Sequence, residues 1–165
     1  MKNDQSFETW YELAFPRCSR AVHAVVLNRS DAEEATSEAF TRALADFDHL
    51  RSHPAPEAWI VTTALNFYRD GFKRRNNPKR WLFAVHESFS HDDQGLSADL
   101  LAAMLQLPER QREVIALRVL LDLSSEQSAE MLGISVPTVS THLRRGLESL
   151  RTSLSHNGAN HESYR

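Results

Sequence analysis

The 165-residue chain contains a single cysteine, Cys18, and only five glycines. Because one cysteine cannot pair within its own chain, a fold held together by internal disulfides is excluded. No run of about 18 apolar residues is present, which excludes a membrane-spanning helix. The first six residues lack the apolar stretch of a signal peptide. Together these absences favour a protein of the cytoplasm.

The motifs of common enzymes and metal sites are also missing. The chain has no glycine-rich phosphate loop, no nucleophile elbow and no HExxH pair, so we predict no enzymatic activity and no cofactor. His49 and His53 are four residues apart, but the nearby prolines disfavour a helical ligand pair, and no cysteine cluster is present. No metal site is therefore predicted. Cys18 lies in an apolar stretch and is interpreted as a small core residue rather than a redox sensor.

Helical periodicity is the main pattern that the chain does contain. Hydrophobic residues make up 41% and charged residues 25%, as is typical of a globular domain. Long stretches lack strand-like alternation of apolar and polar residues. We therefore predict an all-α fold of two small helical domains joined by a linker. The expected limits are residues 6–75 for the first domain, 76–97 for the linker, 98–152 for the second domain and 153–165 for a polar tail, frayed from Ser155 onward.

Two helices are predicted at the start of the first domain. Apolar residues recur at helical spacing between Phe7 and Phe15. Pro16 is then expected to start or kink a second helix, which ends near Asn28.

A third and a fourth helix follow in the same domain. Ser30 and Glu33 have the spacing of a capping box, which predicts a helix that continues to about Phe47. Segment 48–55 lacks periodicity and contains proline, so it is predicted to be an irregular loop. An aromatic-rich fourth helix is predicted to start at Pro56.

The segment 76–97 is largely polar and is predicted to link the two domains. At roughly 3.3–3.6 Å per extended residue, it would reach about 70–80 Å. That length corresponds to about 20 base pairs of duplex DNA. The linker can therefore hold two DNA-binding domains about two turns of DNA apart.

The segment 123–145 predicts a helix-turn-helix. Ser124 and Gln127 have capping-box spacing at the start of a short helix. Gly133 suits the left-handed position that ends such a helix, and Ser135 is placed to cap the next one.

The second helix of this motif has an apolar and a polar face. Spacings of four, four and three residues are expected to turn four side chains inward: Val139, Leu143, Leu147 and Leu150. The outward positions are then Ser140, Thr141, Arg144 and Arg145. Short polar and arginine side chains suit the reading of major-groove edges and the holding of phosphates. Any capped helical hairpin can share the apolar spacing, so it is the glycine corner and the arginines that favour DNA.

Basic residues cluster in two places, although the net charge is −3. Residues 69–80 contain six basic side chains against Asp70 alone, and residues 136–151 contain three arginines against Glu148. Because phosphate binding responds to the local field, both patches are compatible with nucleic acid on an acidic chain.

Two segments resemble conserved regions of the sigma-70 family of RNA polymerase sigma factors, specifically its extracytoplasmic-function (ECF) group. Residues 31–44, followed by Ala58-Trp59-Ile60 and Ala64-Leu65-Asn66, are similar to region 2. Residues 107–114 and the helix-turn-helix are similar to region 4. The segments occur in the family's order and cover most of residues 6–152.

The resemblance implies an alternative sigma factor that binds core RNA polymerase and directs promoter-specific transcription initiation. The first domain would bind polymerase and recognise and melt the −10 element, and the second would read the −35 element as a duplex. The acidic linker resembles the family's segment that runs through the active-site channel of polymerase. An anti-sigma factor is a further expected partner.

The resemblance also assigns individual residues. Polymerase binding falls on the third helix, at Asp31, Glu34, Glu38 and Arg42. Capture of an unstacked −10 base falls on the loop, at Asp48, His49, Leu50, Arg51, Ser52 and His53. The fourth helix would lie along the melted strand with Asn66, Arg69, Lys73 and Arg74. Recognition of the −35 element falls on Pro137, Thr138, Ser140, Thr141, Arg144 and Arg145.

Some positions depart from the family's pattern. Ala35-Thr36-Ser37 replaces a more apolar pair and a glutamine, and Ser128 stands where an apolar residue is common. Ser140 and His142 replace residues that are frequently basic, so the recognition face is less positive than usual.

Two other functions remain open from the sequence. One is a conventional helix-turn-helix regulator with an N-terminal sensing or dimerisation domain, and the other is a polymerase-binding decoy that does not read DNA. The basic and aromatic character of the fourth helix suits single-stranded DNA rather than a ligand pocket.

Overall fold

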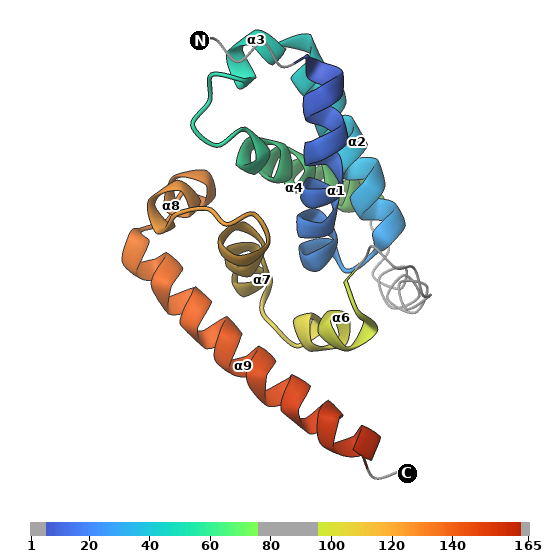
Figure 1. Cartoon of the computed structure of the whole chain (residues 1–165), viewed down its shortest axis with the longest axis vertical. Helices are drawn as coiled ribbons and strands as arrows, with labels where there is room; N and C mark the ends of the chain where they lie inside the picture. Colours follow the sequence, from blue (N-terminus) through green and yellow to red (C-terminus); the bar gives the residue numbers. More distant parts are fainter. Residues whose placement is uncertain (1–5, 76–95, 163–165) are drawn as a thin grey trace.

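The computed structural model describes residues 6–75 and 96–162, of which residues 72–75 and 157–162 are described as backbone only. The regular structure in these ranges is helical throughout, which confirms the predicted all-α fold (Figure 1). The first domain contains α1 (Phe7–Val26), α2 (Arg29–Ala45), α3 (Phe47–Leu50) and α4 (Pro56–Arg75). The second contains α6 (Ala98–Leu105), α7 (Glu109–Ile115), the π-helical turn η1 (Ala116–Leu120), α8 (Ser125–Leu132) and α9 (Val136–Glu162). Among these described helices, none combines the length and the apolar character needed to cross a membrane.

Helix α1 runs without interruption through Pro16, so the predicted division into two helices is wrong. Proline removes one backbone hydrogen bond from a helix interior. Ala14 and Cys18, on either side of Pro16, are both buried in the same core, and this packing keeps the two halves in one helix. The helix ends at Leu27, which adopts the left-handed conformation with φ 63°.

Helix α2 starts two residues earlier than predicted, because its capping residue is Asn28 and not Ser30. The Asn28 side chain accepts a hydrogen bond from the Asp31 amide at 2.8 Å, while Ser30 lies inside the first turn. Glu33 pairs with Arg29 at 2.9 Å rather than closing a capping box. Asn28 thus takes the role that the sequence pattern assigned to Ser30.

Helices α1, α2 and α4 form the core of the first domain, and aromatic rings close one end of it. The Phe40 ring lies at the centre of this group, with centroids of Tyr11 and Trp10 at 5.0 and 5.1 Å. Phe7 and Phe47 add an edge-to-face contact at 5.2 Å. These contacts tie the start of α1 to α3.

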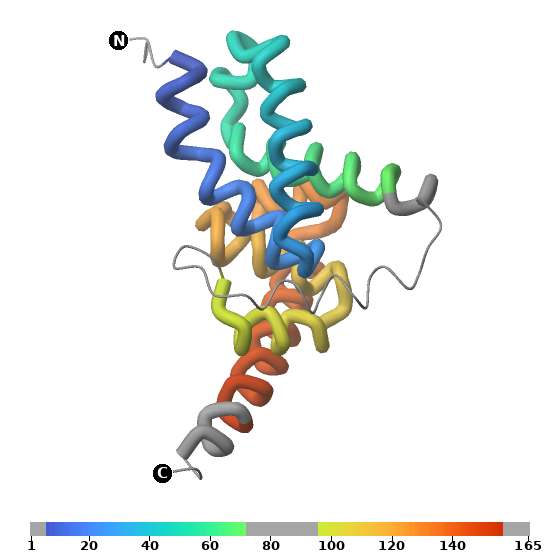
Figure 2. Tube along the Cα trace, turned by 90° about the vertical axis from the view of Figure 1, so that its right-hand side faces the viewer, coloured from blue at the N-terminus to red at the C-terminus, as the bar shows by residue number. Residues whose placement is uncertain are grey.

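In the second domain, α9 is longer than expected. It continues to Glu162, so residues 155–162 of the tail that was expected to be frayed are helical in the structure. Adding residues to an established helix costs little compared with nucleating one, and Leu150 anchors the helix in a buried cluster. In Figures 1 and 2, α9 projects past α6 and away from the rest of the molecule.

The two domains share buried clusters. Ala116, Leu117, Leu121 and Leu123 of the second domain belong to the core formed by α1, α2 and α4. A second cluster joins the C-terminal end of α1 to the second domain, where α6 crosses below it in Figure 2. It contains Ala24, Leu27, Leu101, Met104, Leu107, Ile115 and Leu150.

Candidate nucleic-acid interface

The helix-turn-helix forms as predicted between α8 and α9. Ser124 and Gln127 make both hydrogen bonds of a capping box, at 3.1 and 2.9 Å. Gly133 ends α8 at φ 63°, a conformation that glycine adopts without strain. The Ser135 side chain accepts a hydrogen bond from the Thr138 amide at 3.3 Å and so caps the first turn of α9.

A small apolar core fixes the angle between the two helices of this motif. It consists of Val114, Ala129 and Val139, with Ile134 packed against it from the turn. Ser128, which departs from the family pattern, is fully buried beside Ala129. The core therefore positions α9 with its N-terminal half across α8.

The outward face of α9 carries the residues predicted to read the −35 element. Four of them are exposed, namely Pro137, Ser140, Arg144 and Arg145, and two are half-buried, namely Thr138 and Thr141. Arg144 contacts Glu148 one turn further on, at 3.4 Å. The structure therefore brings all six residues to the first half of a single helix, where they are accessible or partly so.

One of the four residues expected to face inward on α9 does not. Leu147 is 40% exposed, whereas Val139 and Leu150 are buried. At about 100° per residue, position 147 is turned about 80° from Val139, and position 146 only about 20°. Gly146 takes the inward place, where an added Cβ would lie 2.7 Å from Ile115 Cδ1.

The residues predicted to bind polymerase lie along α2, on the part of its surface that borders α4. Glu34 and Arg42 are exposed, and Asp31 and Glu38 are half-buried. Glu38 pairs with Arg42 at 2.9 Å, and the Arg42 guanidinium lies 5.7 Å from the centre of the Phe67 ring in α4. These four residues therefore form a charged strip supported by α4.

The predicted −10 loop is partly helical, which corrects the expected irregular conformation. Helix α3 covers Phe47–Leu50, and Leu50 is buried in the domain core. Its burial leaves no free surface for a base. His49 is exposed, whereas the His53 ring accepts a hydrogen bond from the Ala55 amide at 3.0 Å.

The remaining polar residues of this loop lie at its surface. Asp48, Arg51 and Ser52 are exposed, and Asp48 pairs with Arg51 at 3.2 Å. Among the loop residues, His49 is thus an exposed ring with no role in holding the loop together.

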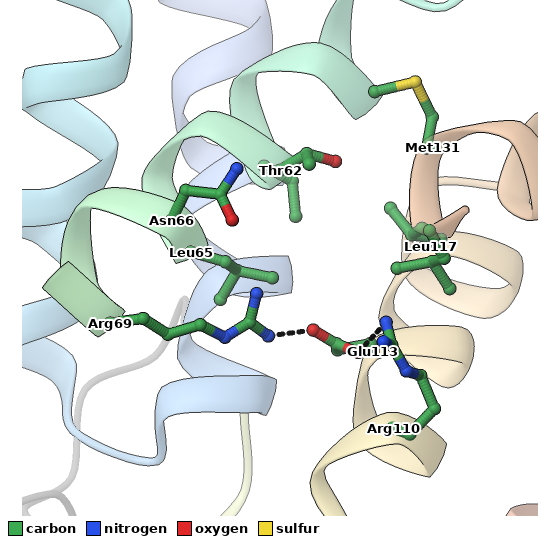
Figure 3. Close-up of a pocket in the computed structure, with 10 residues that line it drawn as sticks. Thr62, Leu65, Asn66, Arg69, Arg110, Glu113, Leu117 and Met131 are labelled. Atoms are coloured by element: carbon green, nitrogen blue, oxygen red, sulfur yellow. Dashed lines mark hydrogen bonds and ion pairs between the residues drawn. The ribbon is translucent and has the colours of Figure 1, made fainter. Parts of the chain in front are cut away.

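The fourth helix presents Asn66 to solvent, but Arg69 is held by the second domain (Figure 3). Its guanidinium donates hydrogen bonds to Glu109 at 3.0 and 2.8 Å and pairs with Glu113. Burial works to lower the pKa of Arg69, but the hydrogen bonds and charges of these carboxylates raise it overall. The side chains of Lys73 and Arg74 lie outside the described residues.

A cavity of about 230 Å³ lies beside this ion-pair group. Figure 3 shows Thr62, Leu65 and Asn66 on the α4 side and Leu117 and Met131 opposite them, with Arg69 and Glu113 at one end. The cavity marks the place where α4 faces α7, η1 and α8.

Sequence reasoning missed the residues that join the domains. Glu109, Arg110, Arg112 and Glu113 belong to the segment that carries the family resemblance, yet no contact was predicted for them. The sequence did contain a signal for this contact. Glu109 and Glu113 are four residues apart and share one helix face, where two carboxylates can bind a basic side chain of another helix.

Comparisons with known proteins decide the family. The family model described as Sigma-70 region 2 matches residues 10–78, and that described as Sigma-70, region 4 matches residues 97–150. The RNA polymerase sigma factor SigV of Bacillus subtilis is 30% identical over 151 residues, which cover 89% of this chain and 85% of SigV. The chain belongs to the sigma-70 family. The ECF sigma factor SigW of Bacillus subtilis is 30% identical over 145 residues, covering 77% of each chain, and places it in the ECF group.

Solved structures of sigma factors share the same fold. The sigma factor RpoE of Bartonella quintana, solved with the anti-sigma factor NepR, superimposes with a TM-score of 0.72 at 22% identity over 90% of this chain and 96% of that chain. CnrH, solved with the cytosolic domain of CnrY, has a TM-score of 0.61 at 20% identity over 94% and 91%. This chain is thus an ECF sigma factor, a class of proteins that direct RNA polymerase to promoters and are not themselves enzymes.

Proposed function

We propose that this ECF sigma factor divides promoter recognition between its two domains, within the limits 6–75 and 98–152. The second domain binds the −35 duplex with the outward face of α9. The first domain binds core polymerase through α2 and holds the melted −10 strand with His49 and with Asn66, Arg69, Lys73 and Arg74 of α4.

The observation that carries the −35 assignment is the accessibility of the outer face of α9. Arg144 and Arg145 are exposed near the start of a helix whose opposite side is fixed by Val139. An arginine on such a helix can donate two hydrogen bonds to one guanine in the major groove. The small, neutral Ser140 beside them leaves room for α9 to lie close to the base edges.

The assignment of α2 to polymerase rests on its charged strip. Asp31, Glu34, Glu38 and Arg42 occupy one side of the helix, and the Arg42 guanidinium lies over the Phe67 ring of α4. A helix braced in this way presents its charges in a fixed arrangement, which lowers the entropy lost on docking.

We also propose that the protein acts in the cytoplasm, where RNA polymerase works, and that an anti-sigma factor holds it inactive. The structure of RpoE with the anti-sigma factor NepR is of that kind. The two domains of this chain offer the same fold for such a partner.

Reconstitution with core polymerase tests the function. The protein is mixed with core enzyme and a library of genomic promoter fragments, and the 5′ ends of the transcripts are mapped. We expect transcripts to start at a fixed distance from a shared pair of sequence elements. Polymerase binding with no promoter opened would favour the decoy, and DNA binding with no affinity for polymerase would favour a conventional regulator.

A further inference from the structure

Part of the surface of α4 that the proposed function assigns to the −10 strand, the part around Arg69, is covered by the second domain of the same chain. Arg69 reaches across to α7 and binds Glu109 and Glu113, and its side chain is 34% exposed. Figure 3 shows this guanidinium pointing at Glu113 rather than outward to solvent.

Glu113 is the central residue of this contact. Its side chain is only 3% exposed, and it pairs with Arg69 on one side and with Arg110 at 2.8 Å on the other. A buried carboxylate is costly unless cations and hydrogen bonds compensate it. Arg69 is therefore needed by Glu113 as long as the domains stay together.

Carboxylates and phosphates compete for the same donors of an arginine. The Nε and Nη2 donors of Arg69 are taken by Glu109 and Glu113, so a phosphate can bind this edge of the guanidinium only after the carboxylates leave it. Through this edge, Arg69 can thus pair with α7 or with the backbone of a DNA strand, but not with both.

Contacts beyond the ion pairs hold the domains in the same arrangement. Arg112 Nε donates to the Val25 carbonyl at 2.9 Å, and Gln127 Nε2 donates to the Pro54 carbonyl at 3.4 Å. Gln127 thereby places the start of α8 against the segment that follows the −10 loop. Leu117 and Leu121 are buried in the core of the first domain.

Helix α9 packs on α6, α7 and α8, and its recognition face takes no part in the contact between Arg69 and α7. Arg144 and Arg145 are exposed while Arg69 is occupied. The structure therefore leaves the −35 surface open and covers part of the −10 surface.

We propose that the free sigma factor closes on itself, with Glu109 and Glu113 acting as a latch that holds Arg69 away from the −10 strand. Release of this latch precedes −10 recognition. The inference rests on the proposed role of Arg69 in binding the melted strand. It concerns the chain without polymerase and needs no second protein.

Distances in the free protein test the closed state. Nitroxide labels are placed at Glu12→Cys on α1 and Ser149→Cys on α9, both exposed positions, while the native Cys18 is buried and stays unlabelled. We expect one narrow distance distribution in the free protein and a longer distance after core polymerase is added. A broad distribution in the free protein, or an unchanged distribution in protein that has bound polymerase, would overturn the proposal.

Charge-neutral variants test the latch itself. Glu109→Gln with Glu113→Gln keeps the side-chain size, and Glu126→Gln with Glu130→Gln removes the same charge from exposed positions of α8. We expect the first pair to raise the population at the longer distance about tenfold. The loss of a hydrogen bond to a charged group shifts an equilibrium constant by about that factor. The second pair should match the wild type. Equal behaviour of the two pairs would overturn the latch.

Binding of a mixed-sequence single-stranded oligonucleotide gives a second readout, followed by fluorescence anisotropy. The latch variant should bind about tenfold tighter than the control variant. Adding Arg69→Gln to the latch variant should abolish that gain. A gain that survives Arg69→Gln would show a bulk charge effect and overturn the proposal.

The outcomes separate this inference from the proposed function. Failure to bind core polymerase counts against the function, whereas the distances in the free protein and the oligonucleotide affinities are measured without polymerase. A closed free protein whose latch variants expose Arg69 supports the inference in either case.

Discussion

Arg112 of α7 donates a hydrogen bond from Nε to the carbonyl oxygen of Val25, 2.9 Å away in the last turn of α1. The same guanidinium donates from Nη1 to the Leu107 carbonyl at 2.7 Å. Carbonyl groups in the last turn of a helix lack partners within the helix, so an arginine there satisfies an otherwise orphaned acceptor. One side chain of α7 therefore connects the end of α1 to the turn before α7.

Removing this side chain should destabilise the protein. Arg112→Ala is expected to lower the free energy of unfolding by about 1.5–3 kcal/mol, because hydrogen bonds from a charged donor are lost at a half-buried site. Urea titration followed by circular dichroism measures the change. Arg151→Ala, at an exposed position of α9, is the matched control and should have little effect.

The start of α2 offers a comparison between the true cap and the position that sequence rules favour. Asn28→Ala should cost about 0.5–2 kcal/mol, because it removes the acceptor for the Asp31 amide. Ser30→Ala should stay within about 0.5 kcal/mol, since Ser30 is exposed within the first turn. Thermal or urea unfolding measures both, and the reverse order would contradict the assignment of the cap.

His49 and Leu50 are adjacent but should respond differently to substitution. His49→Ala should leave duplex −35 binding and stability intact while impairing promoter opening, which permanganate reactivity of unpaired thymines reports. Leu50→Ala should instead cost about 2–5 kcal/mol of stability, because Leu50 is buried. Loss of −35 binding in His49→Ala would count against its role in −10 capture.

Arg145→Ala should weaken binding of a −35 duplex by about 1–3 kcal/mol if the side chain contacts a base edge. The measurement is a titration of a labelled promoter duplex at fixed salt, with Arg151→Ala as control for loss of a positive charge. An affinity equal to that of Arg151→Ala would reassign Arg145 to a solvent-facing role.

Stability should fall on mild acidification because of His23. Burial lowers the pKa of His23, the positive charge of Arg29 lowers it further, and Glu33 opposes both. The unfolded chain therefore binds the proton more readily than the folded one. The contribution of His23 to the free energy of unfolding is complete above about pH 6.5 and decreases as the pH falls toward the folded pKa. Urea unfolding at about pH 7.5 and about pH 5.5 should show a smaller decrease for His23→Gln than for the wild type. An identical decrease would contradict the assignment.

Local patterns in the sequence predicted the parts of the structure that depend on neighbours in the chain. The caps at Ser124 and Ser135 and the turn at Gly133 formed as expected, because each involves residues at most four positions apart. The all-helical fold followed from periodicity in the same way.

Features that depend on the packing of distant segments were not predictable in this way. Pro16 stays within one helix because the core holds both halves, and Leu50 is buried because α3 folds back onto the domain. The contact between Arg69 and Glu113 joins positions 44 residues apart, and no short spacing rule relates them. The family resemblance assigned Arg69 to DNA and said nothing of its second partner.

The end of α1 also determines how this protein can be dissected. Ala24 and Leu27 are buried beside Leu101 and Met104 of the second domain. A fragment that stops at residue 75 would leave this apolar end bare to water, and exposed patches of that kind promote self-association. The first domain should therefore be studied within the intact chain, or as a fragment with polar substitutions at the end of α1.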